Sequence, residues 1–234
     1  MKMTPLNKEV HGALKIAPVA DFRFVGKTHF ASIVLPEFPQ AASTFPIVFI
    51  QNPNTEQYEP VILLGVEPGQ NLFVDEEGNW QASFLPASVR QYPFAYSVSP
   101  DNPEQWVLIF DEESSMLGDE AGDLLFDEKG EETEILQQIM TFIGELQGAA
   151  GVTDEFCRFL MEKDMIMPLG IQVPRGQEMH QVQGVFGINE KRLTELSDEE
   201  FLEFRNKGYL PLMYAHLFSI GQMERLAMLL HAGM

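Results

Sequence analysis

The sequence predicts an α+β fold: a largely antiparallel β-sheet with about three to four packed helices, mainly in the C-terminal half. Two observations predict it. Short runs rich in Val, Ile and Phe alternate with Pro, Gly and Asn clusters over residues 29–110, as in strands joined by turns. Longer apolar stripes at helical spacing follow residue 132, which indicates helices that cover the sheet.

The N-terminal strands come first. The predicted strand segments are HFASIVL, FPIVFI, PVILLGV, NLFVD, YSVS and QWVLIF. The segment LPASVRQYPF lies between them and predicts one helical turn bounded by Pro86 and Pro93, because the residue before a proline is pushed out of the helical region.

An acidic segment at 111–134, with eleven acidic residues and one lysine, leads into the first long helix. That helix is expected at 133–148, with Thr133 as N-cap and an apolar stripe from Ile135 to Leu146. A second helix is expected from Thr153, again as N-cap, to about Lys163.

The C-terminal third returns to strands at MPLGIQV and HQVQGVFGI. SDEEFLEFRNKG then predicts a helix with Ser197 as N-cap, Glu200 completing a capping box and Gly208 as terminator. LFVDEEGN and LLFDEKGE resemble each other and predict two similar hairpin turns. We interpret residues 1–234 as a single domain with a β-rich part (22–110), an acidic connector (111–132) and a helical and strand-containing part (133–234).

Composition bounds the function. The chain has 35 Asp and Glu against 15 Lys and Arg, a formal net charge of -20, which repels nucleic acid and anionic lipid. Its one cysteine, Cys157, lies in the apolar stretch FCRFL and indicates a buried thiol and a reducing compartment. No run approaches the roughly 20 apolar residues of a membrane span. We therefore predict a cytoplasmic protein with no membrane span.

Familiar cofactor and metal motifs are incomplete. VGKT at 25–28 has Asp21 where a phosphate-binding loop needs glycine. Loops that begin at Asp75 and Asp119 do not follow the calcium-loop spacing. The histidines show no metal-ligand spacing. The predictions are no cofactor and no metal site.

The run MYAHLFSIGQMERL places His216 and Ser219 three residues apart on the most apolar side of the last helix. Two buried polar groups, each with one partner, explain the pair better than a nucleophile and its base. The candidates for acid–base or nucleophilic chemistry are His11, His180, His216 and Ser219. Because this helix is apolar nearly all round, it belongs in the core or in an oligomer contact.

A ligand or partner surface is expected where polar and aromatic groups cluster in loops. The residues concerned are Asn71, Asp75, Trp80, Arg90 and Tyr92.

Several stretches resemble the SapC family of bacterial proteins. They are FPIVFI, VILLGVEPGQNLFVDEEGNW, LPASVRQYPF, LFDEKGEETEIL, VFGINEKRLTELSDEEF and GYLPLMYAHLFSIGQMERL. His11 also stands where the family tends to carry a histidine. Where the family commonly has RRYPF, this chain has RQYPF, with Gln91 in place of an arginine. The resemblance implies an accessory protein linked to surface-layer export or assembly, encoded near outer-membrane receptors and flavin-dependent halogenases. It implies no catalytic residue.

Three hypotheses follow. The first is a non-catalytic cytoplasmic accessory protein that binds a protein or peptide partner, connected with surface-layer or outer-membrane receptor systems. The second is a small-molecule or side-chain-modifying enzyme, or its partner subunit, that uses a histidine or metal site with His11, His180 or His216. The third is a structural homodimer joined by the C-terminal helix.

Overall fold

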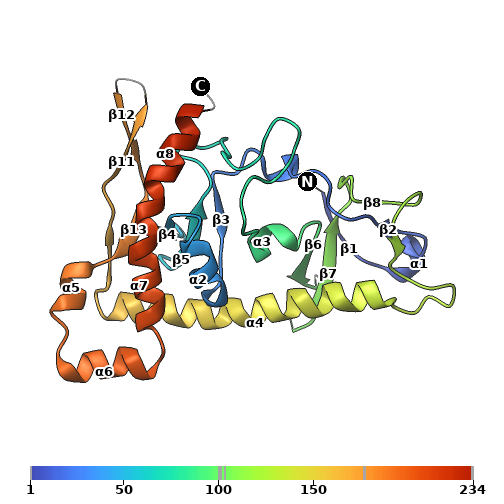
Figure 1. Ribbon diagram of the computed structural model, residues 1–234. Coiled ribbons are helices and arrows are strands. Elements are labelled where there is room, and N and C mark those ends of the chain that lie inside the picture. The colour runs from blue at the N-terminus through green and yellow to red at the C-terminus, as the bar shows by residue number, and fades with distance from the viewer. Residues whose placement is uncertain (1, 100–101, 103, 176–177, 233–234) are drawn as a thin grey trace. The chain divides into compact units, whose positions relative to one another are not determined.

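The computed structural model describes residues 2–99, 102, 104–175 and 178–232. It confirms the α+β class, with several antiparallel sheets and with helices concentrated in the C-terminal half (Figure 1). The chain divides into two compact units. Unit 1 contains Met1–Ala20 and Ala87–Gly148, and unit 2 contains Asp21–Pro86 and Ala149–Met234.

Unit 1 is built on two small antiparallel sheets with strand orders β1-β7-β6 and β8-β2-β9. Its elements are β1 (Met3–Pro5), α1 (Lys8–His11), β2 (Lys15–Ile16), α3 (Ala87–Arg90), β6 (Phe94–Val98), β7 (Trp106–Asp111), β8 (Leu117–Gly118), β9 (Asp123–Leu124) and the first half of α4 (Glu134–Glu162).

The unit 1 core forms because strand residues alternate between two faces. Phe94 pairs with Phe110 across β6 and β7, and both are buried with Leu108 on the same face. Leu136 and Ile143, seven residues apart on α4, pack against this face.

Unit 2 contains a five-stranded antiparallel sheet of order β10-β13-β4-β5-β3 and a separate ribbon, β11-β12. Its strands are β3 (Phe30–Ser32), β4 (Ile47–Gln51), β5 (Tyr58–Leu63), β10 (Ile166–Pro168), β11 (Ile171–Arg175), β12 (Glu178–Val182) and β13 (Val185–Ile188). Its helices, besides the second half of α4, are η1 (Arg23–Val25), η2 (Leu35–Glu37), α2 (Phe38–Ala42), α5 (Glu190–Thr194), α6 (Asp198–Asn206), α7 (Leu210–Ser219), η3 (Ile220–Gln222) and α8 (Met223–Ala232).

Aromatic rings fill the core of unit 2. Phe156 of α4 meets the ring of Phe38 at 6.1 Å and that of Tyr209 at 4.9 Å, both edge-on. Helices α2 and α7 pack together, and both also contact β4. This is the geometry expected of a sheet whose apolar face is covered by helices.

The predicted strands are mostly present. FPIVFI, PVILLGV, YSVS and QWVLIF supply β4, β5, β6 and β7, and LPASVRQYPF supplies the single turn α3. NLFVD is different: it forms only an isolated bridge, between Val74 and Trp80.

The two helices predicted at 133–148 and 153–163 are one helix, α4, drawn in yellow tones in Figure 1. Thr153 is not an N-cap, because its hydroxyl donates to the Ala149 carbonyl at 2.7 Å and accepts the Leu35 amide at 3.1 Å. Both bonds are compatible with a threonine inside a continuous helix. The prediction that a second helix begins at Thr153 is therefore wrong. The hydroxyl of Thr133 donates to the Leu124 and Leu125 carbonyls, at 2.7 and 3.1 Å.

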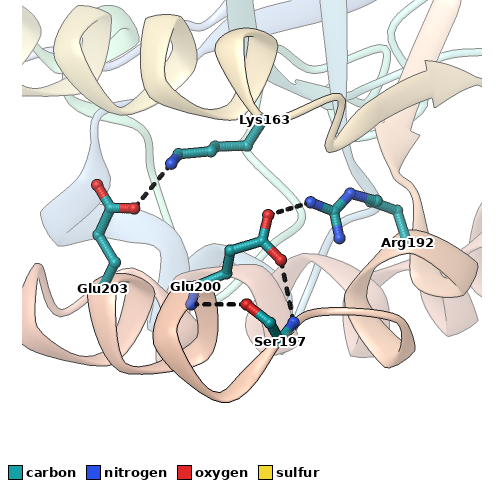
Figure 2. Close-up of polar contacts among 5 residues, drawn as sticks. All are labelled: Lys163, Arg192, Ser197, Glu200 and Glu203. Carbon is teal, nitrogen blue, oxygen red and sulfur yellow. Dashed lines mark hydrogen bonds and ion pairs between the residues drawn. The ribbon is translucent and has the colours of Figure 1, made fainter.

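Helix α6 begins with the predicted capping box, in which Ser197 and Glu200 bond each other's backbone amides. Figure 2 shows that the Glu200 carboxylate also pairs with Arg192, while Lys163, the residue after the end of α4, pairs with Glu203 at 2.7 Å. These ion pairs connect α6 to α4 and to α5.

The two similar turns predicted from LFVDEEGN and LLFDEKGE are confirmed. In each, the aspartate side chain accepts the amide four residues on: Asn79 to Asp75 at 2.7 Å and Glu131 to Asp127 at 2.8 Å. Gly78 and Gly130 take φ values of 88° and 77°, which favour glycine. One turn lies in each unit.

Candidate functional site

Unit 1 contains a pocket of about 320 Å³. Its lining is mostly apolar and comes from β2, the end of α3 and the residues after it, the start of β6, the segment around β8 and β9, and α4. The lining residues are Ile16, Ala17, Pro18, Arg90, Gln91, Tyr92, Phe94, Met116, Asp123, Ile135, Ile139, Phe142 and Ile143. Few polar side chains in a mainly apolar wall are typical of a binding pocket.

Two residues of the predicted ligand surface, Arg90 and Tyr92, line this pocket. The Arg90 guanidinium is exposed and lies 4.8 Å from the centre of the Phe142 ring. The Tyr92 hydroxyl donates to the carboxylate of Asp111 at 3.0 Å. These contacts hold both side chains at the pocket wall, where a cation and a phenol ring can meet a ligand.

Asp111 does not line the pocket itself, but its carboxylate fixes the position of the Tyr92 side chain in the pocket wall. It is buried, and its carboxylate accepts the Lys2 amide at 2.8 Å and the Glu113 amide at 3.3 Å, besides the Tyr92 hydroxyl. Burial alone would raise the pKa of Asp111, but these donors outweigh it and hold the pKa below its usual value. Burial raises the pKa of Tyr92, and the hydrogen bond to Asp111 adds to that rise.

The other three residues of the predicted surface, Asn71, Asp75 and Trp80, lie in unit 2 and make local contacts there. Asn71 is buried; its amide donates to the Val25 carbonyl at 3.0 Å and its oxygen accepts the Phe73 amide at 2.9 Å. Asp75 closes the turn described above. The Trp80 indole donates to the Phe84 carbonyl at 2.9 Å.

His216 and Ser219 are buried, as predicted, with exposed fractions of 1% and 0%. Ser219 has partners: its hydroxyl donates to the His216 carbonyl at 2.6 Å and accepts the Ile47 amide at 2.9 Å. The prediction of a partner is wrong for His216, whose ring nitrogens form no hydrogen bond within the described residues. Its ring stacks on Phe49 at 5.4 Å instead, and burial lowers its pKa to about 4.

The last helix is also not continuous. A 3₁₀ turn, η3, separates α7 from α8, so the predicted last helix consists of two α-helices joined by a short turn. Phe218 on α7 is 80% exposed and Met228 on α8 is 64% exposed. A homodimer through this region stays a prediction. If it forms, Phe218→Asp should dissociate it, and the sedimentation coefficient should fall from that of a dimer to that of a monomer.

The two remaining candidates lie at different places. His11, at the end of α1, accepts the Asn7 amide at 3.0 Å and packs edge-on against Phe110 at 4.9 Å. His180 lies on β12, and its side chain is outside the described residues. Among the residues the structure describes, no cluster of three or more His, Cys, Asp or Glu could hold a metal ion.

Cys157 is a buried thiol, as predicted, with a pKa raised by burial to about 12. The helices in the described ranges include none with the length and apolarity needed to cross a bilayer.

Unit 2 has a pocket of its own, of about 570 Å³, at the ends of β3 and β5 and beside the turn from β12 to β13. Four polar side chains, from His29, Glu67, Gln181 and Gln183, contribute to its wall. Burial lowers the pKa of His29 and so favours the neutral imidazole.

Sequence reasoning missed most of the unit 1 pocket wall, although a signal was present. At 100° per residue, the apolar stripe of α4 is about 160° wide. Leu136, Met140 and Ile143 occupy the side that packs on the sheet. Ile135, Ile139 and Phe142, on the other side, are partly buried against this core and also line the pocket, as does Ile143. A stripe this wide serves two surfaces.

The fold and the site together define a class: an α+β protein with a preformed apolar pocket and charged groups at its wall. The family is shown by sequence. The SapC family model matches residues 6–226, and the chain belongs to the SapC family. No curated protein and no solved structure matches the chain.

Proposed function

We propose that the chain is a non-catalytic cytoplasmic accessory protein that binds a basic segment of another protein. An apolar side chain of that segment would enter the unit 1 pocket. The pocket is the observation that carries the proposal. Its volume, about 320 Å³, is at the lower end of the range of ligand pockets, roughly 300 to 1,000 Å³.

The wall suits an anchor side chain. Ile139 and Phe142 are half-buried on α4, so an apolar group that covers them would remove further apolar surface from water. Binding energy in protein interfaces is concentrated in a few such anchors. Arg90 and Tyr92 remain part of the proposed surface, while the contacts of Asn71, Asp75 and Trp80 support a structural role.

The charge of unit 1 supports a basic partner. The segment 111–134 has eleven acidic residues and one lysine, half of the chain's net charge of -20, and Asp123 from this segment lines the pocket. Opposite charge speeds encounter and disfavours acidic competitors. A partner in a surface-layer or outer-membrane receptor system is what the family resemblance implies.

A randomised nonapeptide display library, panned against the full-length chain, tests the proposal. We expect recovered peptides to be rich in Lys and Arg and to share an apolar residue. Ile139→Trp, which fills the pocket, should lose these peptides. Thr141→Trp, on the exposed side of α4, is the matched control and should keep them.

Melting curves of both variants establish that each is folded. Recovery of the same peptides by Ile139→Trp, or recovery of peptides without positive charge, would contradict the proposal. Failure to recover any peptide would contradict it as well.

A second candidate function rests on the unit 2 pocket, where Glu67 and His29, whose pKa is lowered by burial, line the same cavity. A histidine and an acid that face one cleft are the kinds of group that acid–base chemistry on a small molecule would need. Ligand-observed NMR with a fragment library tests this candidate. Fragments that bind the wild type and not His29→Ala would support it, and fragments that bind both equally would not.

A further inference from the structure

Strand β6 forms one edge of the unit 1 sheet, whose order is β1-β7-β6. It pairs with β7 on one side, from Phe94 opposite Phe110 to Val98 opposite Trp106. No other strand in the described part of the chain pairs with its second side. An edge of this kind presents backbone groups to which another chain can bond.

Hydrogen bonds at the two ends of β6 show which groups face outward. The Asp111 amide donates to the Pro93 carbonyl at 3.0 Å, and the Ser99 amide donates to the Gln105 carbonyl at 2.7 Å. In an antiparallel pair the bonded residues alternate. Ala95 and Ser97 therefore bond to β7, and the backbone groups of the residues between them and after them point away.

The outward-facing residues are Phe94, Tyr96 and Val98. The Phe94 amide donates a hydrogen bond to the Gln91 carbonyl at 2.8 Å. The Val98 carbonyl accepts the Ser97 hydroxyl at 3.4 Å. Among the described residues the amides of Tyr96 and Val98 have no partner, which leaves two donors two residues apart along the edge.

Edges that must stay unpaired usually carry proline, charge or a bulge. The stretch FAYSV of β6 has none of these. Val98 is 42% exposed and Trp106, opposite it, is 55% exposed. An open edge with exposed apolar side chains is suited to receive a strand.

The charge of the chain indicates whether the added strand comes from a second copy of this protein or from a different protein. A second copy would bring another net charge of -20, so self-pairing is opposed by repulsion. A basic segment of a different protein is attracted to the same edge.

We infer that β6 accepts an extended, basic segment of a partner protein as a fourth strand, bonded to the backbone of Tyr96 and Val98. This inference rests on the proposed function and specifies how the peptide binds. Alternate side chains of an added strand point to one face of the sheet. On β6 that face is the one where Phe94 is buried and lines the pocket, so a side chain opposite the start of β6 would enter it.

The partner class follows from this geometry. It is an extended segment in which apolar residues alternate with other residues, and in which Lys and Arg supply net positive charge. The Tyr96 hydroxyl donates to the Met140 carbonyl of α4 at 3.5 Å, so α4 lies against the face of β6 that would receive the apolar residues.

The test replaces Val98 in two ways. Val98→Pro removes the outward amide, and Val98→Ala keeps it while removing most of the side chain. With a synthetic nonapeptide recovered from the library, we expect Val98→Ala to bind within about twofold of the wild type, and Val98→Pro to bind about tenfold more weakly, as for one lost hydrogen bond. Equal binding by the two variants would overturn the inference.

Amide hydrogen exchange in the wild type is the second measurement and needs no substitution. Adding the peptide should slow exchange at Tyr96 and Val98 and leave Ala95 and Ser97, already bonded to β7, unchanged. No slowing would also overturn strand addition. Loss of binding in Ile139→Trp together with full binding in Val98→Pro would refute this inference alone, whereas full binding in both would refute the proposed function as well.

Discussion

Asp111 in unit 1 and His216 in unit 2 are both buried ionisable side chains, but their surroundings differ. In unit 1, Asp111 is 3% exposed and its carboxylate accepts bonds from three donors. In unit 2, His216 is 1% exposed, and the described residues offer its ring nitrogens no partner. At similar burial, hydrogen-bond donors stabilise the charged form of Asp111 in unit 1, whereas burial without a partner favours the neutral form of His216 in unit 2.

The difference predicts that acid weakens the two units over different pH ranges. The pKa of His216 is lowered from 6.5 to about 4, so the unfolded chain takes up a proton first and stability falls as pH drops from about 6.5 to 4. The lowered pKa of Asp111 acts later. Its contribution is present above the unfolded pKa of about 3.9 and is lost as pH falls through the folded value.

The largest expected effect is that of His216→Phe, which replaces the imidazole with an apolar ring that can still stack on Phe49. Moving a pKa from about 6.5 to about 4 corresponds to about 3 kcal/mol. The free energy of unfolding of the wild type should therefore fall by about 3 kcal/mol more than that of the variant between pH 7 and pH 4. Urea titrations at several pH values measure this difference. A cost of fitting the larger ring that does not depend on pH cancels when the two pH values are compared. If the unfolding free energies of wild type and variant depend on pH in the same way, the lowered pKa of His216 is contradicted.

The next effect is that of Asp111→Asn in unit 1. An amide has one acceptor oxygen, so the donors of Lys2, Tyr92 and Glu113 can no longer all be satisfied. We expect a loss of about 2 to 3 kcal/mol at pH 7, as for hydrogen bonds to a charged group, and a flatter profile below pH 4. Tyr92→Phe, which removes one donor, is the control and should cost about 1 kcal/mol. A variant as stable as the wild type at pH 7 would show that the carboxylate is not needed.

Ser219→Ala should have a smaller effect in unit 2. It leaves the Ile47 amide of β4 without its acceptor in a buried site, which costs about 1 to 2 kcal/mol. Hydrogen exchange locates the loss: the Ile47 amide should exchange faster, while the amides of unit 1 keep their rates. Unchanged exchange at Ile47 would mean that another group replaces the hydroxyl.

The same residues show what the sequence could and could not predict. FPIVFI and QWVLIF form strands, as their runs of Val, Ile, Leu and Phe predicted. The capping box of Ser197 and Glu200 was also predictable, because it is a local signal that needs no tertiary context. The apolar neighbours of His216 predicted its burial. Its lack of a partner was not predictable, because hydrogen bonding depends on which elements pack around the ring.

The continuity of α4 and the part of the unit 1 pocket wall outside this helix were not predictable from the sequence, for a related reason. Thr153 has the residue type of a helix start, and only its bonds to Ala149 and Leu35 show that it lies inside a helix. The pocket draws its wall from segments far apart in the chain, of which β2, β8 and β9 are only two residues long. Strands this short leave no period to detect.

The smallest effect on stability is expected for Glu200, which sharpens the comparison because it is a carboxylate held by donors, like Asp111, but near the surface. Its pKa is lowered to about 2, first by the Ser197 amide and then by Arg192. Arg192→Met should raise the pKa only in part, since the larger contribution remains. Carboxyl ¹³C NMR titration measures this shift.

Water and salt screen the ion pair of Glu200 and Arg192. High salt should therefore reduce the difference in the pKa of Glu200 between wild type and variant, and the variant should lose less stability than Ser219→Ala. A wild-type pKa near 4.5 would show that the donors drawn in Figure 2 do not hold the charge in solution.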